Sequence, residues 1–231
     1  MGRIIAIANQ KGGVGKTTTS INLSACLAEI GQKVLTVDID PQGNTTSGLG
    51  VDKNTVENNV YDLLLGECSI EDCIVETEIE NQSLIASNVN LAGAEIELIG
   101  IDEKEYILKK ALNKVKKQYD FIIIDCPPSL GMITINAFAS VDSVLIPLQA
   151  AYLPIKGLQQ LIRTIGKVKR QINQKLEFEG ILFTMVDART TYAQKNMEKI
   201  REAYGNNIYM FKTNIPQSVR AAETPACGIS I

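Results

Sequence analysis

Positions 10–18 read Gln10-Lys11-Gly12-Gly13-Val14-Gly15-Lys16-Thr17-Thr18, and this segment decides the fold. It follows a short apolar run at residues 4–8 and opens a helix-length segment at residues 16–30. Glycine permits backbone conformations in which successive N–H groups turn inward around an anion, and a helix N-terminus adds the positive end of its dipole. A strand, a glycine-rich turn and a helix in this order predict a phosphate-binding loop.

The lysines of this loop predict a nucleoside triphosphate as the ligand. We expect Lys16 to meet the β- and γ-phosphates and the Thr17 hydroxyl to coordinate Mg²⁺. The usual pattern has glycine where Gln10 stands, and Lys11 adds a second cation; two lysines held close together repel each other unless a polyanion is present. A glycine-rich turn with solvated lysines is the alternative. The expected nucleotide contacts are Lys11, Gly12, Gly13, Val14, Gly15, Lys16, Thr17 and Thr18.

Three aspartates follow apolar runs of strand length, namely Asp38, Asp40 and Asp125. Open α/β sheets place their ligands at the carboxyl ends of the strands, so we expect these carboxylates to face the phosphate loop. Asp125 ends a run of four apolar residues and is expected to hold Mg²⁺ through water. The prolines and serine at 127–129 lock a non-helical turn suited to sensing the γ-phosphate. Solvated acids at strand ends are the alternative.

Strand-length and helix-length segments alternate along the chain, which predicts an α/β protein with a mostly parallel, twisted central sheet flanked by helices. The polar region 51–100 has the weakest pattern, and there we expect short helices and one strand near residues 84–87. With 231 residues, one domain over 1–231 is expected. The strand candidates are 4–8, 34–37, 121–124, 144–148, 181–186 and 208–211; the helix candidates are 16–30, 104–117, 155–172 and 193–204.

Composition narrows the function classes. The net charge of −3 gives no global attraction to nucleic acid or membrane, so such a partner must be met by a local basic face. The five cysteines form no CxxC pair and the chain has no histidine, which favours a reduced cytoplasmic protein. No apolar stretch is long enough for a signal peptide or a membrane span, so neither export nor anchoring is expected.

Three motifs together resemble one family. They are KGGVGKTT at 11–18, VDIDPQGN at 37–44 and FIIIDCPPSLG at 121–131, and they are similar to the deviant Walker A ATPases, above all the ParA/Soj-type partitioning ATPases. The resemblance implies a three-layer P-loop NTPase fold, Mg²⁺ as cofactor and ATP as substrate. It implies catalytic roles for Lys11, Lys16 and Asp40: Lys11 reaches the partner's phosphates across a homodimer, and Asp40 orients the attacking water. Thr17, Asp38 and Asp125 then surround the metal.

The same resemblance implies further contacts and partners. Adenine is expected near Met185 and Pro216, although Met185 is otherwise a core residue and Pro216 a strand stop. Arg189 and Arg220 are expected on a surface that binds DNA without sequence preference, whereas charge spacing alone favours a solvated helix face. A ParB-like (ParB/Spo0J-like) protein is the implied stimulating partner, and plasmid or chromosome partitioning on the nucleoid is the implied role.

The chain also departs from the family. Residues 149–157 lack the acidic positions that the family usually has there, and the chain ends at Ile231 without the closing C-terminal helix of relatives. A MinD-type protein-positioning ATPase is the second hypothesis, but it requires a C-terminal amphipathic helix, which residues 224–231 do not encode. An iron–sulfur carrier, a reductase component or a small-molecule ligase is the third. Cys126 has no second cysteine in a comparable position, so a buried structural thiol is expected there.

Overall fold

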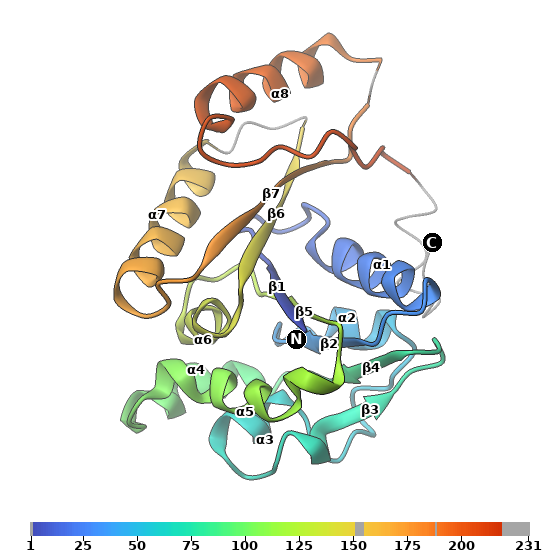
Figure 1. Ribbon diagram of the computed structural model, residues 1–231, viewed down its shortest axis with the longest axis vertical. Coiled ribbons are helices and arrows are strands. Elements are labelled where there is room, and N and C mark those ends of the chain that lie inside the picture. Colours follow the sequence, from blue (N-terminus) through green and yellow to red (C-terminus); the bar gives the residue numbers. More distant parts are fainter. Residues whose placement is uncertain (1, 151–154, 188, 219–231) are drawn as a thin grey trace.

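The computed structural model describes residues 2–150, 155–187 and 189–218. Within these ranges seven strands form one twisted sheet in the order β3-β4-β2-β5-β1-β6-β7, and every pair is parallel except β3 with β4 (Figure 1). The predicted mostly parallel sheet is therefore confirmed. The strands are β1 (Arg3–Ile7), β2 (Val34–Asp38), β3 (Ile74–Glu76), β4 (Gln82–Ile85), β5 (Phe121–Asp125), β6 (Ser143–Gln149) and β7 (Glu177–Thr184).

Helices cover both faces of the sheet. Helix α1 lies on one side, whereas α5, α6 and α7 lie on the other, and α8 lies beyond the sheet edge formed by β7 (Figure 1). This arrangement gives the three predicted layers. The α-helices are α1 (Lys16–Glu29), α2 (Asn44–Gly48), α3 (Val60–Leu65), α4 (Leu91–Glu97), α5 (Ile107–Val115), α6 (Met132–Ser140), α7 (Ile155–Gln171) and α8 (Thr191–Tyr204); short 3₁₀ turns are Glu71–Cys73, Leu98–Gly100, Lys104–Tyr106 and Lys116–Gln118.

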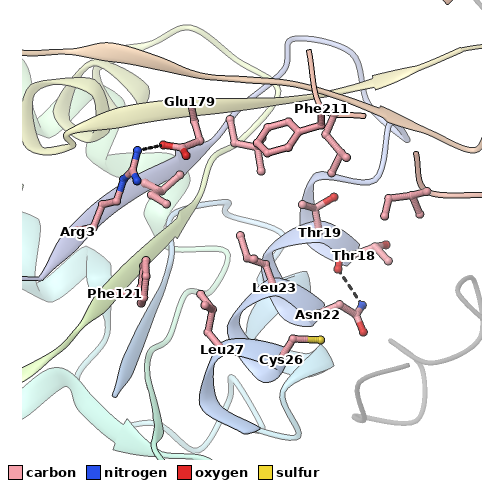
Figure 2. Close-up of a pocket in the computed structure, with 14 residues that line it drawn as sticks. Arg3, Thr18, Thr19, Asn22, Leu23, Cys26, Leu27, Phe121, Glu179 and Phe211 are labelled. Atoms are coloured by element: carbon pink, nitrogen blue, oxygen red, sulfur yellow. Dashed lines mark hydrogen bonds and ion pairs between the residues drawn. The ribbon is translucent and has the colours of Figure 1, made fainter. Parts of the chain in front are cut away.

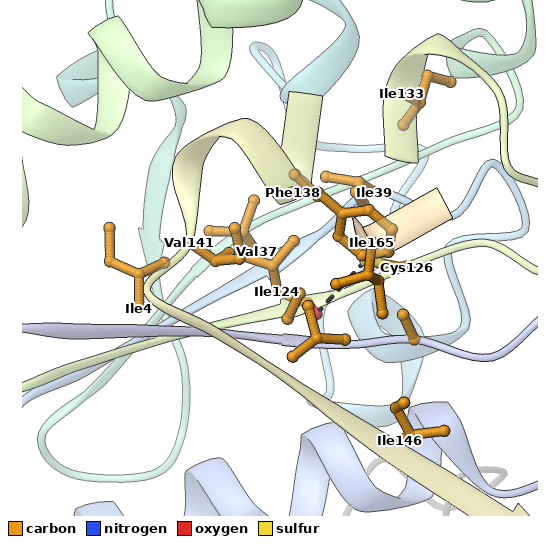
Figure 3. Close-up of a cluster of buried hydrophobic side chains, with 14 of the residues drawn as sticks. Ile4, Val37, Ile39, Ile124, Cys126, Ile133, Phe138, Val141, Ile146 and Ile165 are labelled. Carbon is orange, nitrogen blue, oxygen red and sulfur yellow. Dashed lines mark hydrogen bonds between the residues drawn. The ribbon is translucent and has the colours of Figure 1, made fainter. Parts of the chain in front are cut away.

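The central strands are apolar on both faces because both faces are buried. Ile4 and Ile124 belong to a large core cluster that also contains Phe138 of α6 and Ile165 of α7 (Figure 3). Their neighbour Ile5 points into a second cluster, packed against α1. Successive side chains of a strand point to opposite faces, so β1 and β5 join the two helical layers. Cys126 lies fully buried in the first cluster, as a structural thiol should.

The predicted strand at 208–211 is wrong. Only one bridge, Ile181 with Met210, forms beside β7 there, and a second bridge joins Val186 to Pro216. Between the two bridges the segment advances six residues while β7 advances five, so the ladder loses its register. Pro216 also has no N–H to donate. Residues 210–216 therefore run beside β7 at the edge of the sheet. Among the described residues they do not form an eighth strand.

Three elements were not predicted, and several boundaries differ. The unpredicted helix α2 has only five residues, and β7 begins at Glu177, four residues before the strand expected at 181–186. Helix α6 is buried on nearly all sides, so it lacks the polar face that reveals an amphipathic helix. Strand β3 has only three residues, and β4 begins at Gln82, earlier than the strand expected near 84–87. The helix expected over 104–117 is a 3₁₀ turn, α5 and a second 3₁₀ turn. No helix in the described ranges is both long and apolar enough to cross a bilayer.

Candidate nucleotide site

The phosphate loop connects β1 to α1 and has the backbone that its glycines predict. Gly13 and Gly15 have φ angles of 69° and 85°, a left-handed region that other residues rarely adopt. Gly15 is the N-cap of α1, and no side chain caps the first turn of this helix. Thr184, at the end of β7, donates its hydroxyl to the Val14 carbonyl at 2.8 Å. This hydrogen bond thus attaches the phosphate loop to the sheet. The N-terminus of α1 faces the concave side of the loop.

The two lysines occupy different depths in this loop. Lys16 is 7% exposed and donates its ammonium to the Lys11 carbonyl at 3.4 Å. Lys11 is partly exposed at the rim, and its ammonium donates to the Gln149 side-chain carbonyl at 3.0 Å. The Lys11 N–H donates to Asn9 Oδ1, and Asn9 donates to the Pro147 carbonyl at 2.7 Å. Lys11 is therefore held against the end of β6 in its own chain.

Asp125 is the centre of a buried polar cluster. Only 1% exposed, it accepts hydrogen bonds from the hydroxyls of Thr17 at 2.8 Å, Ser20 at 3.0 Å and Thr45 at 2.6 Å. Burial raises the pKa of this carboxyl, while the three hydroxyls and the Lys16 ammonium act in the opposite direction. A buried carboxylate beside a threonine hydroxyl is an oxygen-rich donor set that suits Mg²⁺. The residues present therefore fit the predicted metal.

Asp38 lies fully buried next to Asp125 on the adjacent strand. Its carboxylate accepts the N–H and the hydroxyl of Thr46, both at 2.8 Å, and the Asp40 N–H at 3.1 Å. Burial and then repulsion by Asp125 raise its pKa to about 7, although these hydrogen bonds lower it. Two buried acids in contact favour a cation between or beside them. Asp38 also fixes the start of the loop that carries Asp40.

Asp40 lies at the rim rather than in the buried cluster. Its side chain is partly exposed and accepts the Gln42 N–H at 3.0 Å, while its carbonyl accepts the Ser87 hydroxyl at 2.8 Å. A Cβ at Gly43 would lie only 2.6 Å from the Ser87 carbonyl, so this turn packs closely on the segment after β4. Asp40 is placed where water can reach it.

The structure brings only some of the remaining predicted residues together. Met185 follows β7 with a φ of 51°, a conformation that costs a non-glycine residue about 1–3 kcal/mol. The bridge between Val186 and Pro216 places Pro216 beside it. Arg189 is exposed and donates to both carboxylate oxygens of Asp187, at 3.0 and 3.1 Å. Arg220 lies outside the described residues.

A groove of about 610 Å³ lies beside α1, and it is not the phosphate site. It lies between α1 and the sheet, where Leu23 and Leu27 face Phe121 and Phe211 (Figure 2). Thr18 and Thr19 lie at its edge, and the ion pair of Arg3 with Glu179, at 2.6 Å, closes another side. Its lining is almost wholly apolar, so a polyphosphate has no reason to enter it.

Sequence reasoning missed several polar residues of the site. Thr45, Thr46 and Ser20 complete the buried cluster, Asn9 and Gln149 hold Lys11, and Ser87 holds the Asp40 loop. Their residue types are too common to mark a site by themselves. The one available signal was position: Thr45 and Thr46 directly follow the DPQGN motif, and Gln149 ends a strand.

Comparison with known proteins agrees with this geometry. A family model described as an AAA domain matches residues 2–178. The sporulation initiation inhibitor protein Soj of Bacillus subtilis (strain 168) is 53% identical over 228 residues, which cover 99% of this chain and 89% of the relative. A solved structure of cobyrinic acid a,c-diamide synthase from Mycobacterium smegmatis, with a bound ATP analogue and magnesium, is 38% identical with a TM-score of 0.90, covering 99% of this chain and 93% of that one.

A partition protein is also among the structural neighbours. The putative plasmid partition protein of Borrelia burgdorferi B31, bound to AMPPNP, has a TM-score of 0.80 at 27% identity and covers 98% of this chain and 89% of that one. The synthase shares the fold, but the identity is higher to Soj and extends over nearly the whole chain. The chain therefore belongs to the Soj/ParA family of chromosome-partitioning ATPases.

Proposed function

We propose that this chain is an ATP-dependent dimerising switch that binds DNA without sequence preference and drives plasmid or chromosome partitioning with a ParB-like partner. The observation that carries this proposal is the pair of lysines in one loop. Lys16 is buried where its own nucleotide would lie, whereas Lys11 is at the rim. One lysine suffices for the phosphates of a single chain, so the second is available to a neighbouring chain.

ATP hydrolysis to ADP and phosphate follows from the groups around the loop. Lys16 and the α1 N-terminus neutralise phosphate charge. Thr17 and Asp125 would hold Mg²⁺, which supplies further neutralisation between the β- and γ-phosphates; Asp38 supports this arrangement from the next strand. Asp40, at the rim, orients the attacking water. Phosphoryl transfer depends mainly on such positioning and charge stabilisation, so no strong general base is needed.

Dimer formation would require Lys11 to leave Gln149. Its present bond joins an ammonium to a neutral amide, at 3.0 Å. A phosphate oxygen carries negative charge and attracts an ammonium more strongly than a neutral amide carbonyl does, so a phosphate of the partner's ATP can replace the Gln149 carbonyl. Adenine is proposed to lie near Met185 and Pro216, which are neighbours at the end of β7.

The DNA-binding surface is proposed to include α7 in addition to Arg189 and Arg220. Helix α7 has 17 residues and no acidic one. Arg163, Lys167 and Arg170 are exposed around a shallow hollow of about 390 Å³, and none of them forms an ion pair within the described ranges. Unpaired cations along one helix face can each meet a phosphate of the duplex. Arg189, in contrast, must first leave Asp187.

Helix α5 provides an internal comparison for this surface. It is also lysine-rich, but Lys110 is paired with Glu103 at 2.5 Å and Lys109 stacks over the Tyr106 ring. The reversal of Arg163, Lys167 and Arg170 to Glu is expected to abolish DNA binding. The same reversal of Lys110, Lys114 and Lys117, which changes the net charge equally, is expected to leave most of it. Equal losses in both variants would mean that only overall charge matters.

The decisive experiment measures DNA binding with ADP, with ATP, and with ATP after Lys11→Ala, at two salt concentrations. We expect binding that requires ATP, requires Lys11 and weakens with salt by about 0.9 log units per log unit of salt for each phosphate contacted. DNA binding that ignores ATP would disprove the switch. ATP binding without any DNA response would favour a MinD-like or other protein-positioning ATPase, which flotation with anionic liposomes then tests.

A further inference from the structure

The segment that follows β4 touches both loops that flank the proposed γ-phosphate position. One loop follows β2 and carries Asp40; the other follows β5, covers residues 127–131 and leads into α6. Strands β2 and β5 are neighbours in the sheet, so the two loops emerge side by side. We infer that Ser87 and Glu95, in the segment after β4, are positioning residues for ATP hydrolysis.

Ser87 holds the Asp40 loop at two points. Its hydroxyl donates to the Asp40 carbonyl at 2.8 Å. Its N–H donates to the Thr46 hydroxyl at 3.0 Å, and Thr46 in turn donates to Asp38. Ser87 is fully buried, and its bond to the Thr46 hydroxyl is shielded from water, whereas its bond to the Asp40 carbonyl is partly exposed. The position of Asp40 is therefore fixed from outside its own loop.

Glu95 holds the other loop. It belongs to α4, and its carboxylate accepts the N–H groups of Met132 at 2.7 Å and Ile133 at 3.3 Å. These are the first two residues of α6, whose N-terminal N–H groups have no partner within the helix. A carboxylate at this end is also favoured by the helix dipole. Gly131 has no Cβ to displace Glu95, and a Cβ built there would collide with its carboxylate oxygens.

The two contacts make one rigid connection between the loops. Ser87 and Glu95 lie eight positions apart in one short stretch that ends in α4, so neither loop can shift without straining the other. The positions of the two loops affect the transition state of hydrolysis. A small misplacement of the attacking water, or of the groups that contact the γ-phosphate, raises the activation free energy. In the described bonds, neither Ser87 nor Glu95 contacts the phosphate loop 10–18 or the proposed adenine neighbours Met185 and Pro216. Loss of either contact should therefore lower kcat and leave ATP affinity in place.

Glu95→Ala tests the inference against Glu97→Ala, a matched control on the same helix. The Glu97 carboxylate accepts the Tyr61 hydroxyl at 2.9 Å and does not contact α6 in any described bond. We expect Glu95→Ala to lower kcat about ten-fold with the Kd for ATP within about two-fold, because the groups around the γ-phosphate are displaced while the binding contacts remain. Glu95→Gln, which keeps an acceptor, should restore part of kcat. Gly131→Ala and Ser87→Ala should lower kcat in the same way.

The inference rests on the proposed role of Asp40 and on the expected γ-phosphate sensing by residues 127–129, so Asp40→Ala belongs in the same assay. If Asp40→Ala hydrolyses ATP normally, the proposed site is wrong. If Asp40→Ala loses hydrolysis but Glu95→Ala equals Glu97→Ala in kcat, only the inference is overturned. A proportional loss of kcat and ATP affinity in Glu95→Ala would also overturn it. Should Glu95→Ala fail to fold, Glu95→Gln and Gly131→Ala give the same decision.

Discussion

Asp125 ends β5 and Asp40 follows the neighbouring strand β2, yet the chain holds them by different means. Asp125 is 1% exposed and is fixed by three side-chain hydroxyls. Asp40 is partly exposed, and its carboxylate accepts a backbone N–H from its own turn. We call the buried part of the site, with Asp125 and Lys16, its floor, and the partly exposed part, with Asp40 and Lys11, its rim. The side chains of the floor are thus held rigidly and shielded from water, whereas those of the rim are accessible to water. The difference suggests that the floor binds Mg-ATP and the rim governs hydrolysis and dimer formation.

The largest expected effect comes from the floor. Lys16→Ala removes the buried ammonium that we propose to meet the β- and γ-phosphates, so ATP affinity should fall by about 100-fold or more and hydrolysis should be lost. Titration with a fluorescent ATP analogue measures the affinity. Lys175→Ala, at an exposed position far from the loop in sequence, is the control. If the Lys16→Ala protein binds ATP as tightly as the wild type does, the floor is not the part of the site that binds ATP.

The rim should separate binding from hydrolysis. Asp40→Ala is expected to lower kcat by about 10- to 100-fold, because the attacking water loses its orientation, with little change in the Kd for ATP. Phosphate release and equilibrium binding, measured on the same preparation, check this. Asp40→Asn retains a polar group of the same size and distinguishes loss of charge from loss of shape. A parallel fall in affinity would place Asp40 in the floor.

The buried acids predict an unusual pH dependence. The pKa of Asp38 rises from an ordinary value of 3.8 to about 7 on folding. Its favourable contribution to folding is therefore present below the unfolded pKa and is lost as pH rises through the folded one. Without metal, wild type should lose up to about 1.4 kcal/mol per pH unit between pH 5 and 7 relative to Asp38→Asn.

Urea unfolding of both proteins in a chelator, at pH 5.5 and 7.5, measures this difference. Comparison with Asp38→Asn removes the contributions of carboxyls that do not interact with Asp38, such as Asp72, Glu103 and Asp187, whose lowered pKa values have the opposite effect on stability. Mg-ATP should reduce the difference, since a bound cation stabilises the ionised pair. A wild type that gains stability with pH as much as Asp38→Asn does would show that Asp38 titrates normally.

The smallest expected effect comes from the hydrogen bond that joins β7 to the phosphate loop. Thr184→Val removes the hydrogen bond to the Val14 carbonyl without changing the shape of the side chain. The free energy of unfolding should fall by about 1 kcal/mol and the Kd for ATP should rise only about three-fold, because one neutral hydrogen bond is lost. Thr184→Ser, which keeps the hydroxyl, is the control. A loss of ATP affinity as large as that of Lys16→Ala would show that Thr184 is as important for ATP binding as the buried lysine.

The sequence predicted those parts of the site that are marked by uncommon residue patterns. The glycines and lysines of 10–18, and single aspartates at the ends of apolar strands, occur together for few reasons other than phosphate and Mg²⁺ binding. Strands β1, β2, β5, β6 and β7 were found because buried parallel strands form continuous apolar runs. Local pattern therefore gave the floor of the site and the centre of the sheet.

Long-range contacts account for what the sequence did not predict. Helix α6 is buried on nearly every side, so it shows no period, and its N-terminus is capped by Glu95 from a different helix. Ser87 and Thr45 are ordinary residues until folding brings them to Asp40 and Asp125. The segment 208–211 has the composition of a strand, but its bridges to β7 change register. Such features depend on three-dimensional neighbours and leave no local signal.

The mass of the protein in solution tests the proposed switch most directly. Asp40→Ala, which should bind ATP and hydrolyse it slowly, is measured with Mg-ATP and with Mg-ADP, next to Asp40→Ala combined with Lys11→Ala. We expect about twice the 25.2 kDa of one chain with ATP, and a single chain with ADP or without Lys11. A single chain under saturating ATP, or a dimer that forms equally well without Lys11, would show that Lys11 does not join two chains through ATP.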